Sequence, residues 1–166
     1  AALDNFTVDA PVHIHTVEVV LDGYNIYFNS IEFIEGFQVN VYSSPQTAGS
    51  DLVGDVATNY LDVADVSISP NWLGYGYLLS LPVSIDVDTG ELWLAVISEN
   101  NFQSNGMIGV NTSLIGDGEY AWQANPNGGW GLPGNVEQME GDLAYNIYIV
   151  SELTPCEYPL PQICAA

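Results

Sequence analysis

Apolar residues recur at every second position in four segments of the chain. Between Leu79 and Val87, every odd position is apolar. Successive side chains of a strand point to opposite faces of a sheet, so this alternation predicts strands with one buried face. The apolar stripes occupy odd positions in residues 13–21, where they begin with His13 and His15, and in residues 37–41, 79–87 and 143–149.

An apolar run and a series of turn signals complete the pattern. Residues 92–97 are apolar at every position, which predicts a central strand buried on both faces. Pairs of Gly, Pro, Asn and Asp separate the strand segments, and no segment shows a helical period. Short strands with turns about every 8–12 residues predict an all-β fold, an antiparallel β-sandwich of jelly-roll-like type. The turn signals include Asp22-Gly23, Ser44-Pro45, Ser69-Pro70, Asp88-Thr89-Gly90, Asn105-Gly106, Asp117-Gly118 and Asn127-Gly128.

The length of the chain suits one domain with an appendage. Of its 166 residues, 48% are hydrophobic, which is enough for a sizeable core. We expect residues 1–153 to form the sandwich and residues 154–166 to form an extended, Pro-rich tail. Both cysteines, Cys156 and Cys164, lie in that tail. Their spacing favours a disulfide that closes a small loop in an oxidising compartment, with two free thiols or a metal-binding pair as alternatives.

The chain has acidic side chains but no strongly basic ones. It contains 21 Asp and Glu residues but no Lys or Arg, which gives a formal net charge of −21. Without Lys the chain cannot form a Schiff base, and without Arg it cannot clamp a phosphate through two hydrogen bonds. Nucleic acids would lack electrostatic attraction to it, and anionic membrane surfaces would repel it. We therefore expect neither as a partner.

Several features favour a secreted, extracellular or cell-surface protein. No run of about 18 apolar residues is present, so no segment is predicted to span a membrane. The chain begins at Ala1-Ala2 without a basic segment, which fits a mature chain after removal of a signal peptide. Sequons at Asn5 and Asn111 allow N-glycosylation if the host performs it.

Two segments carry motifs, Gly90-Glu91-Leu92-Trp93-Leu94 and Asp142-Leu143-Ala144-Tyr145. They are similar to the Gly-x-Tyr-Trp-Leu strand and the closing Asp-Leu-Ala-Phe strand of a family of secreted prokaryotic β-sandwich domains, and the resemblance covers residues 3–150. The opening segments 4–8 and 37–42 resemble that family as well, whereas the Cys-bearing tail departs from its pattern. The resemblance implies export and a jelly-roll-like fold, and it implies no catalytic residues.

Two groups of side chains are candidate metal ligands. His13 and His15 are predicted on one strand face, where two imidazoles could share Zn²⁺ or Cu²⁺ with a third ligand. They could instead cap the apolar stripe that follows them. Asp86, Asp88 and Glu91 surround a tight turn and could offer oxygen ligands to Ca²⁺. An Asp-Thr-Gly hairpin turn, however, needs no metal.

Aromatic residues gather in two glycine-rich segments. Trp72, Tyr75 and Tyr77 lie in the first, and Trp130 lies in the second. Exposed rings at these positions could stack on the rings of a polysaccharide or anchor a neighbouring subunit. Buried rings would instead pack against the core or the loops.

The favoured hypothesis is an exported structural subunit that self-assembles into a filament, tube, sheath or surface layer. Copies would pair as a homo-oligomer or polymer through sheet edges or chain ends, residues 1–9 and 151–166. Because copies that each carry −21 repel one another, assembly needs apolar contact, salt, acid or bridging Ca²⁺.

The alternative hypothesis is a carbohydrate-binding β-sandwich module that uses the four aromatic residues named above. We expect no enzyme and no required cofactor. No nucleophile motif is present, and nothing distinguishes a carboxylate pair for glycoside hydrolysis.

Overall fold

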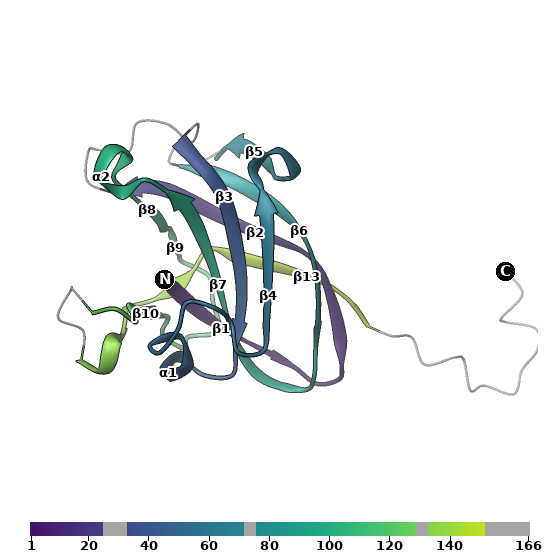
Figure 1. Cartoon of the computed structure of the whole chain (residues 1–166). Helices are drawn as coiled ribbons and strands as arrows, with labels where there is room; N and C mark the ends of the chain where they lie inside the picture. The colour runs from purple at the N-terminus through teal and green to yellow at the C-terminus, as the bar shows by residue number, and fades with distance from the viewer. Residues whose placement is uncertain (25–32, 72–75, 129–132, 152–166) are drawn as a thin grey trace, which may run out of the picture.

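The chain folds into two antiparallel β-sheets that pack face to face (Figure 1). A computed structural model describes residues 1–24, 33–71, 76–128 and 133–151. Within these ranges the architecture confirms the predicted all-β, antiparallel sandwich. No helix in this part of the chain is long and apolar enough to cross a membrane.

The strands are distributed over a six-stranded sheet, a five-stranded sheet and a small two-stranded ladder. The six-stranded sheet holds β1 (Ala2–Val8), β3 (Ile34–Tyr42), β4 (Ala57–Asp62), β7 (Gly90–Asn100), β10 (Trp122–Ala124) and β11 (Val136–Gln138). The five-stranded sheet holds β2 (Val12–Tyr24), β5 (Ser67–Pro70), β6 (Tyr77–Val87), β8 (Met107–Val110) and β13 (Tyr145–Ser151). The ladder and the short helical turns are β9 (Thr112–Ser113), β12 (Asp142–Leu143), α1 (Pro45–Ala48), α2 (Phe102–Asn105), η2 (Val63–Asp65) and η3 (Pro133–Asn135).

The order of the strands sets the edges of the sandwich. The six-stranded sheet runs β11-β10-β1-β7-β3-β4, and the other runs β13-β2-β6-β5 with β8 also paired to β2. β1 therefore lies inside its sheet, paired with β7 along its length and with β10 at Ala2 and Leu3. Pairing of residues 1–9 with another copy stays a prediction, because β10 covers only Ala2 and Leu3 on the side of β1 that faces away from β7.

The main core fills the space between the sheets. The alternation predicted the buried face of β6, and the continuous apolar run predicted that β7 is buried on both faces. All the odd positions of β6 from Leu79 to Val87 are buried, while Pro82, Ser84 and Asp86 are exposed. Leu92 to Val96 of β7 are buried on both faces. Each fully buried aliphatic side chain contributes about 1.5–3 kcal/mol, so burial in these two strands contributes substantially to stability.

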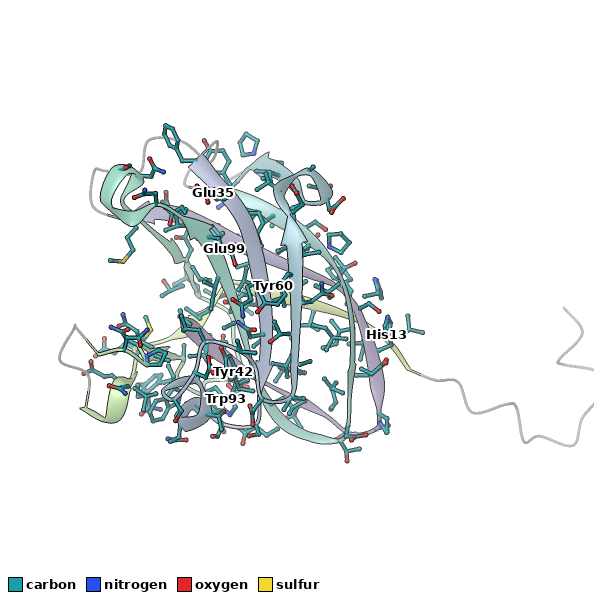
Figure 2. The ribbon with its side chains drawn as sticks, in the orientation of Figure 1. His13, Glu35, Tyr42, Tyr60, Trp93 and Glu99 are labelled. Atoms are coloured by element: carbon teal, nitrogen blue, oxygen red, sulfur yellow. The ribbon has the colours of Figure 1, made fainter. Side chains whose placement is uncertain are left out.

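β3 departs from the predicted pattern because both of its faces are buried. Gln38, Asn40 and Tyr42 alternate with the core residues and were expected to face solvent, yet they are 8%, 0% and 0% exposed. The segment between β3 and β4, which contains α1, folds back over this outer face. Figure 2 shows Tyr42 near Trp93 in the small second cluster that forms there.

β2 changes face part-way along its length. Val12 and Ile14 are buried before the change, and Val17, Val19 and Leu21 are buried after it. The pairing of β2 with β6 shifts register between Ile14 and Thr16. A bulge of this kind moves the following side chains to the other face of the sheet. The prediction that His13 and His15 share a face with the stripe at residues 17–21 is therefore wrong.

Candidate functional site

The edge strands of the two sheets differ in how well they are protected against pairing with another chain. β11 has three residues and carries Glu137, β5 has four residues and ends at Pro70, and β4 ends at Asp62. Short length, charge and proline are the usual devices that prevent edge-to-edge pairing. β13 has seven residues, YNIYIVS, with neither a charge nor a proline. Among the described edge strands it is the longest that has neither; β8, which pairs with β2 alone, also lacks both but has only four residues.

The outer part of β13 exposes three consecutive apolar side chains. Tyr148, Ile149 and Val150 are 43%, 48% and 55% exposed. The Tyr148 hydroxyl donates a hydrogen bond to Oε2 of Glu18 at 2.7 Å, which fixes the ring on the outer face. The register against β2 shifts between Tyr148 and Ile149, and this bulge is the one irregularity of the strand. We refer to residues 145–151 as the β13 edge.

A cavity of about 360 Å³ lies between β1 and the beginning of the β13 edge. One wall contains Asp4, Asn5 and Phe6, and the other contains Tyr145 and residues 146–147. Leu94 of β7 and residues 115–117 and 142–143 complete the lining. The cavity combines carboxylates with apolar side chains, and no Lys or Arg is available to neutralise it.

Asp4 is the buried carboxyl group of this cavity. It is 9% exposed, and its Oδ2 accepts a hydrogen bond from the backbone N–H of Leu143 at 2.7 Å. Its Oδ1 accepts a second hydrogen bond from the backbone N–H of Asn5 at 3.1 Å. Burial raises the pKa of Asp4 to about 6, the two hydrogen bonds oppose the rise, and the charges of Asp142 and Asp117 add to it. Asp4 therefore binds a proton in mildly acidic solution.

Three further carboxylates surround the side-chain amide of Asn5. Its Nδ2 donates to Glu91 at 3.4 Å, to Asp117 at 3.3 Å and to Glu119 at 3.4 Å. Asn5 therefore ties β1 to β7 and to the loop that precedes β10. It also belongs to the first sequon, and glycosylation at Asn5 or at Asn111 stays a prediction.

The two histidines have separate partners. His13 Nδ1 lies 2.7 Å from Oδ1 of Asp86, and His15 Nδ1 lies 2.9 Å from Oγ1 of Thr16. The ring of His15 also packs against that of Tyr148, with their centroids 6.3 Å apart. Figure 2 shows His13 near one end of the sandwich, away from the carboxylates of Glu35 and Glu99.

The carboxylates predicted to bind Ca²⁺ do not form one site. Asp86 faces His13, whereas Glu91 faces Asn5. Among the residues that the structure describes, no group of three or more His, Cys, Asp or Glu side chains is placed to hold a metal ion. The structure thus does not bring Asp86, Asp88 and Glu91 together around a cation, nor does it give His13 and His15 a shared third ligand.

The predicted aromatic surface and the disulfide fall largely outside the described residues. Trp72, Tyr75 and Trp130 lie there, as do Cys156 and Cys164. Sugar stacking and the disulfide therefore stay predictions. Tyr77, the remaining aromatic residue, begins β6 and packs partly buried against the main core.

Two apolar features were not foreseen from the sequence. The loop after β9 exposes Leu114 and Ile115 almost completely, at 105% and 88%. A second cavity, of about 460 Å³, is lined mainly by apolar residues from β7 and β8 and by Met139. Periodicity identifies which face of a strand is buried, but it does not show whether a loop residue is covered. No sequence signal could have revealed either feature.

Comparisons with known proteins add no relative. Searches against protein families, curated proteins and solved structures found no match to this chain. The resemblance to secreted prokaryotic β-sandwich domains accordingly stays an expectation based on the motifs. Support for a proposed function therefore comes from the edges, cavities and exposed side chains of the chain itself.

Proposed function

We propose that this protein is an extracellular structural subunit and that two copies join through their β13 edges. The supporting observation is the seven-residue β13 edge, which has no charge, no proline and three exposed apolar side chains in succession. In the joined pair, the two β13 strands lie antiparallel across a two-fold axis. Their free backbone groups then form a ladder, and the two five-stranded sheets become one continuous sheet.

The charge of the molecule favours this edge over the others. Two copies that each carry −21 repel each other, and the repulsion between exposed charges acts over about 8 Å at physiological ionic strength. β13 itself carries no carboxylate, whereas β11 carries Glu137 and β4 carries Asp62; the nearest carboxylate on the β13 side, Glu18 of β2, is hydrogen-bonded to Tyr148. Covering Tyr148, Ile149 and Val150 also removes apolar surface from water, which stabilises the pair.

A charge placed on the β13 edge tests the proposal. In a two-fold pair, Val150→Asp introduces one carboxylate from each copy at the same contact, so we expect the variant to be monomeric where the unmodified chain is dimeric. Tyr60→Asp is the matched control, because Tyr60 is 62% exposed on the edge strand β4 and the substitution adds the same charge. Sedimentation velocity over a range of protein concentrations measures both variants.

Each possible result of this experiment either supports or contradicts pairing at β13. A dimer that is lost in Val150→Asp and kept in Tyr60→Asp supports pairing at β13. Equal loss in both variants would show that net charge alone controls association. An unmodified chain that stays monomeric at high concentration, in salt and in mild acid would overturn the proposed function itself.

A further inference from the structure

Pairing at β13 cannot by itself produce a polymer, so the proposed function requires a second contact. A two-fold contact uses the same surface on both copies and closes as a dimer. An open filament forms when one surface of a copy meets a different surface of the next copy and the contact does not close into a ring. The inference of a second contact therefore rests on the proposed function. Two apolar surfaces are available for it, an exposed loop after β9 and a cavity beside β8.

The loop after β9 supplies the protruding apolar side chains of this contact. Leu114 and Ile115 have the highest exposed fractions among the large apolar side chains that the structure describes. Residues 111–116 contain no charged side chain, although Asp117 follows directly. The Ser113 hydroxyl holds the turn, since it donates to the carbonyl oxygen of Ile115 at 2.6 Å and accepts from the backbone N–H of Ile115 at 3.1 Å. We call Leu114 and Ile115 the apolar tip.

The cavity beside β8 supplies the apolar surface that would receive these side chains. Its walls include Val96 and Ile97 of β7, Met107 and Ile108 of β8, and Met139. No Asp or Glu side chain lines it, although the chain has 21 of them. Its volume of about 460 Å³ lies within the range of roughly 300–1,000 Å³ that is typical of binding pockets. Two methionines give the walls flexible, apolar side chains that adapt to an incoming group.

We propose that the apolar tip of one copy inserts into the β8 cavity of a second copy. Neither the side chains of the tip nor the lining of the cavity contains a carboxylate, although Asp117 follows the tip and Asp142 lies against Gly116. The contact itself therefore places no two carboxylates directly together. The tip and the cavity are different surfaces, which makes the contact heterologous and capable of continuing from copy to copy. Joined through β13, each dimer presents two tips and two cavities, and such dimers link into a polymer.

Complementary variants of the full chain test this contact. The tip variant Leu114→Ser with Ile115→Ser keeps the cavity, and the cavity variant Met107→Glu keeps the tip. The matched control Val53→Ser with Val56→Ser removes two apolar side chains that are 47% and 39% exposed elsewhere. Met139→Glu, on another part of the wall, replaces Met107→Glu if thermal unfolding shows that the latter is not folded.

Negative-stain electron microscopy and sedimentation then follow polymer formation. We expect the tip and cavity variants each to stop at the dimer, with the critical concentration for polymer raised by about tenfold or more. The control should polymerise like the unmodified chain. An equimolar mixture of the tip and cavity variants should polymerise again, because dimers with two intact cavities alternate with dimers with two intact tips.

Different results would overturn different parts of the account. If the tip variant polymerises normally, or if the mixture stays dimeric, the tip–cavity contact is wrong while pairing at β13 stands. If native mass spectrometry shows a small apolar molecule in the cavity, and Met107→Glu releases it without affecting the polymer, the cavity is a ligand site rather than a contact between copies. If the unmodified chain never exceeds a monomer, the proposed function fails first.

Discussion

At the scale of single residues, Asp4 shows what the absence of Lys and Arg does to this fold. A buried carboxyl group in most proteins can be paired with a base, but here the backbone N–H groups of Asn5 and Leu143 donate hydrogen bonds to it. These donors do not offset the loss of water and the nearby charges of Asp142 and Asp117, so the pKa rises to about 6. The folded chain therefore binds a proton at Asp4 more tightly than the unfolded chain does.

The raised pKa of Asp4 predicts a direction for stability against pH. The stabilising effect of Asp4 protonation is complete below 3.8, the ordinary pKa of an aspartate side chain, and is lost as the pH rises through about 6. Asp4→Asn cannot ionise, so its free energy of unfolding relative to that of the unmodified chain should rise by up to about 3 kcal/mol between pH 4 and pH 7. The difference should shrink towards pH 4. Urea unfolding at several pH values measures it.

Asp9→Asn is the control for Asp4, because it removes the same charge from an exposed position near the end of β1. We expect it to change stability little at any pH. A pH-independent effect of Asp4→Asn, or an equal effect of both substitutions, would contradict the role given to burial.

At the scale of elements, β3 holds the segment that covers its outer face through a buried amide. Oδ1 of Asn40 accepts hydrogen bonds from Thr58 at 2.7 Å, from Gln38 at 3.0 Å and from the backbone N–H of Gly54 at 3.2 Å. Gly54 lies so close to β3 that an added Cβ would meet backbone oxygens of Val41 and Ala57. The covering segment thus depends on both the amide and the glycine.

Loss of the Asn40 acceptor should be more costly than loss of one of its donors. Asn40→Ala removes an acceptor from three donors, although the backbone N–H of Gly54 keeps Oγ1 of Thr58 and the amide of Gln38 keeps the carbonyl oxygen of Leu52. We expect it to lower the free energy of unfolding by about 2–3 kcal/mol. Thr58→Val removes one donor and should cost about 1–2 kcal/mol. Chemical denaturation measures both variants. Equal costs would show that Asn40 is not the centre of this network.

The elements also show how far the sequence predicts this fold. Alternation identified the buried face of β6, and the unbroken apolar run identified β7 as buried on both faces, because each strand pairs with neighbours on both sides. It failed at β2, where a bulge reverses the faces, and at β3, where a covering segment buries polar residues. Bulges and covering segments depend on contacts between distant parts of the chain, which periodicity does not record.

At the scale of the whole molecule, charge decides where copies can meet. The sequence showed that repulsion must be overcome, and it predicted contact through sheet edges or chain ends without showing which strand forms an edge. The structure pairs residues 2–8 with other strands of one sheet and leaves β13 as the longest described edge strand without a charge or a proline. Which strand becomes an edge depends on the order of strands in each sheet, and the apolar tip and its cavity depend on loop packing. Neither could be predicted from local pattern.

Amide hydrogen exchange of the β13 edge tests the central claim most directly. The exchange of residues 145–151 is compared between dilute and concentrated protein at physiological ionic strength, with residues 57–62 of β4 as the internal reference. If β13 strands pair, amides of residues 145–151 become more protected as the concentration rises, while those of β4 do not change. Unchanged exchange in β13 at a concentration where copies are associated would contradict the account.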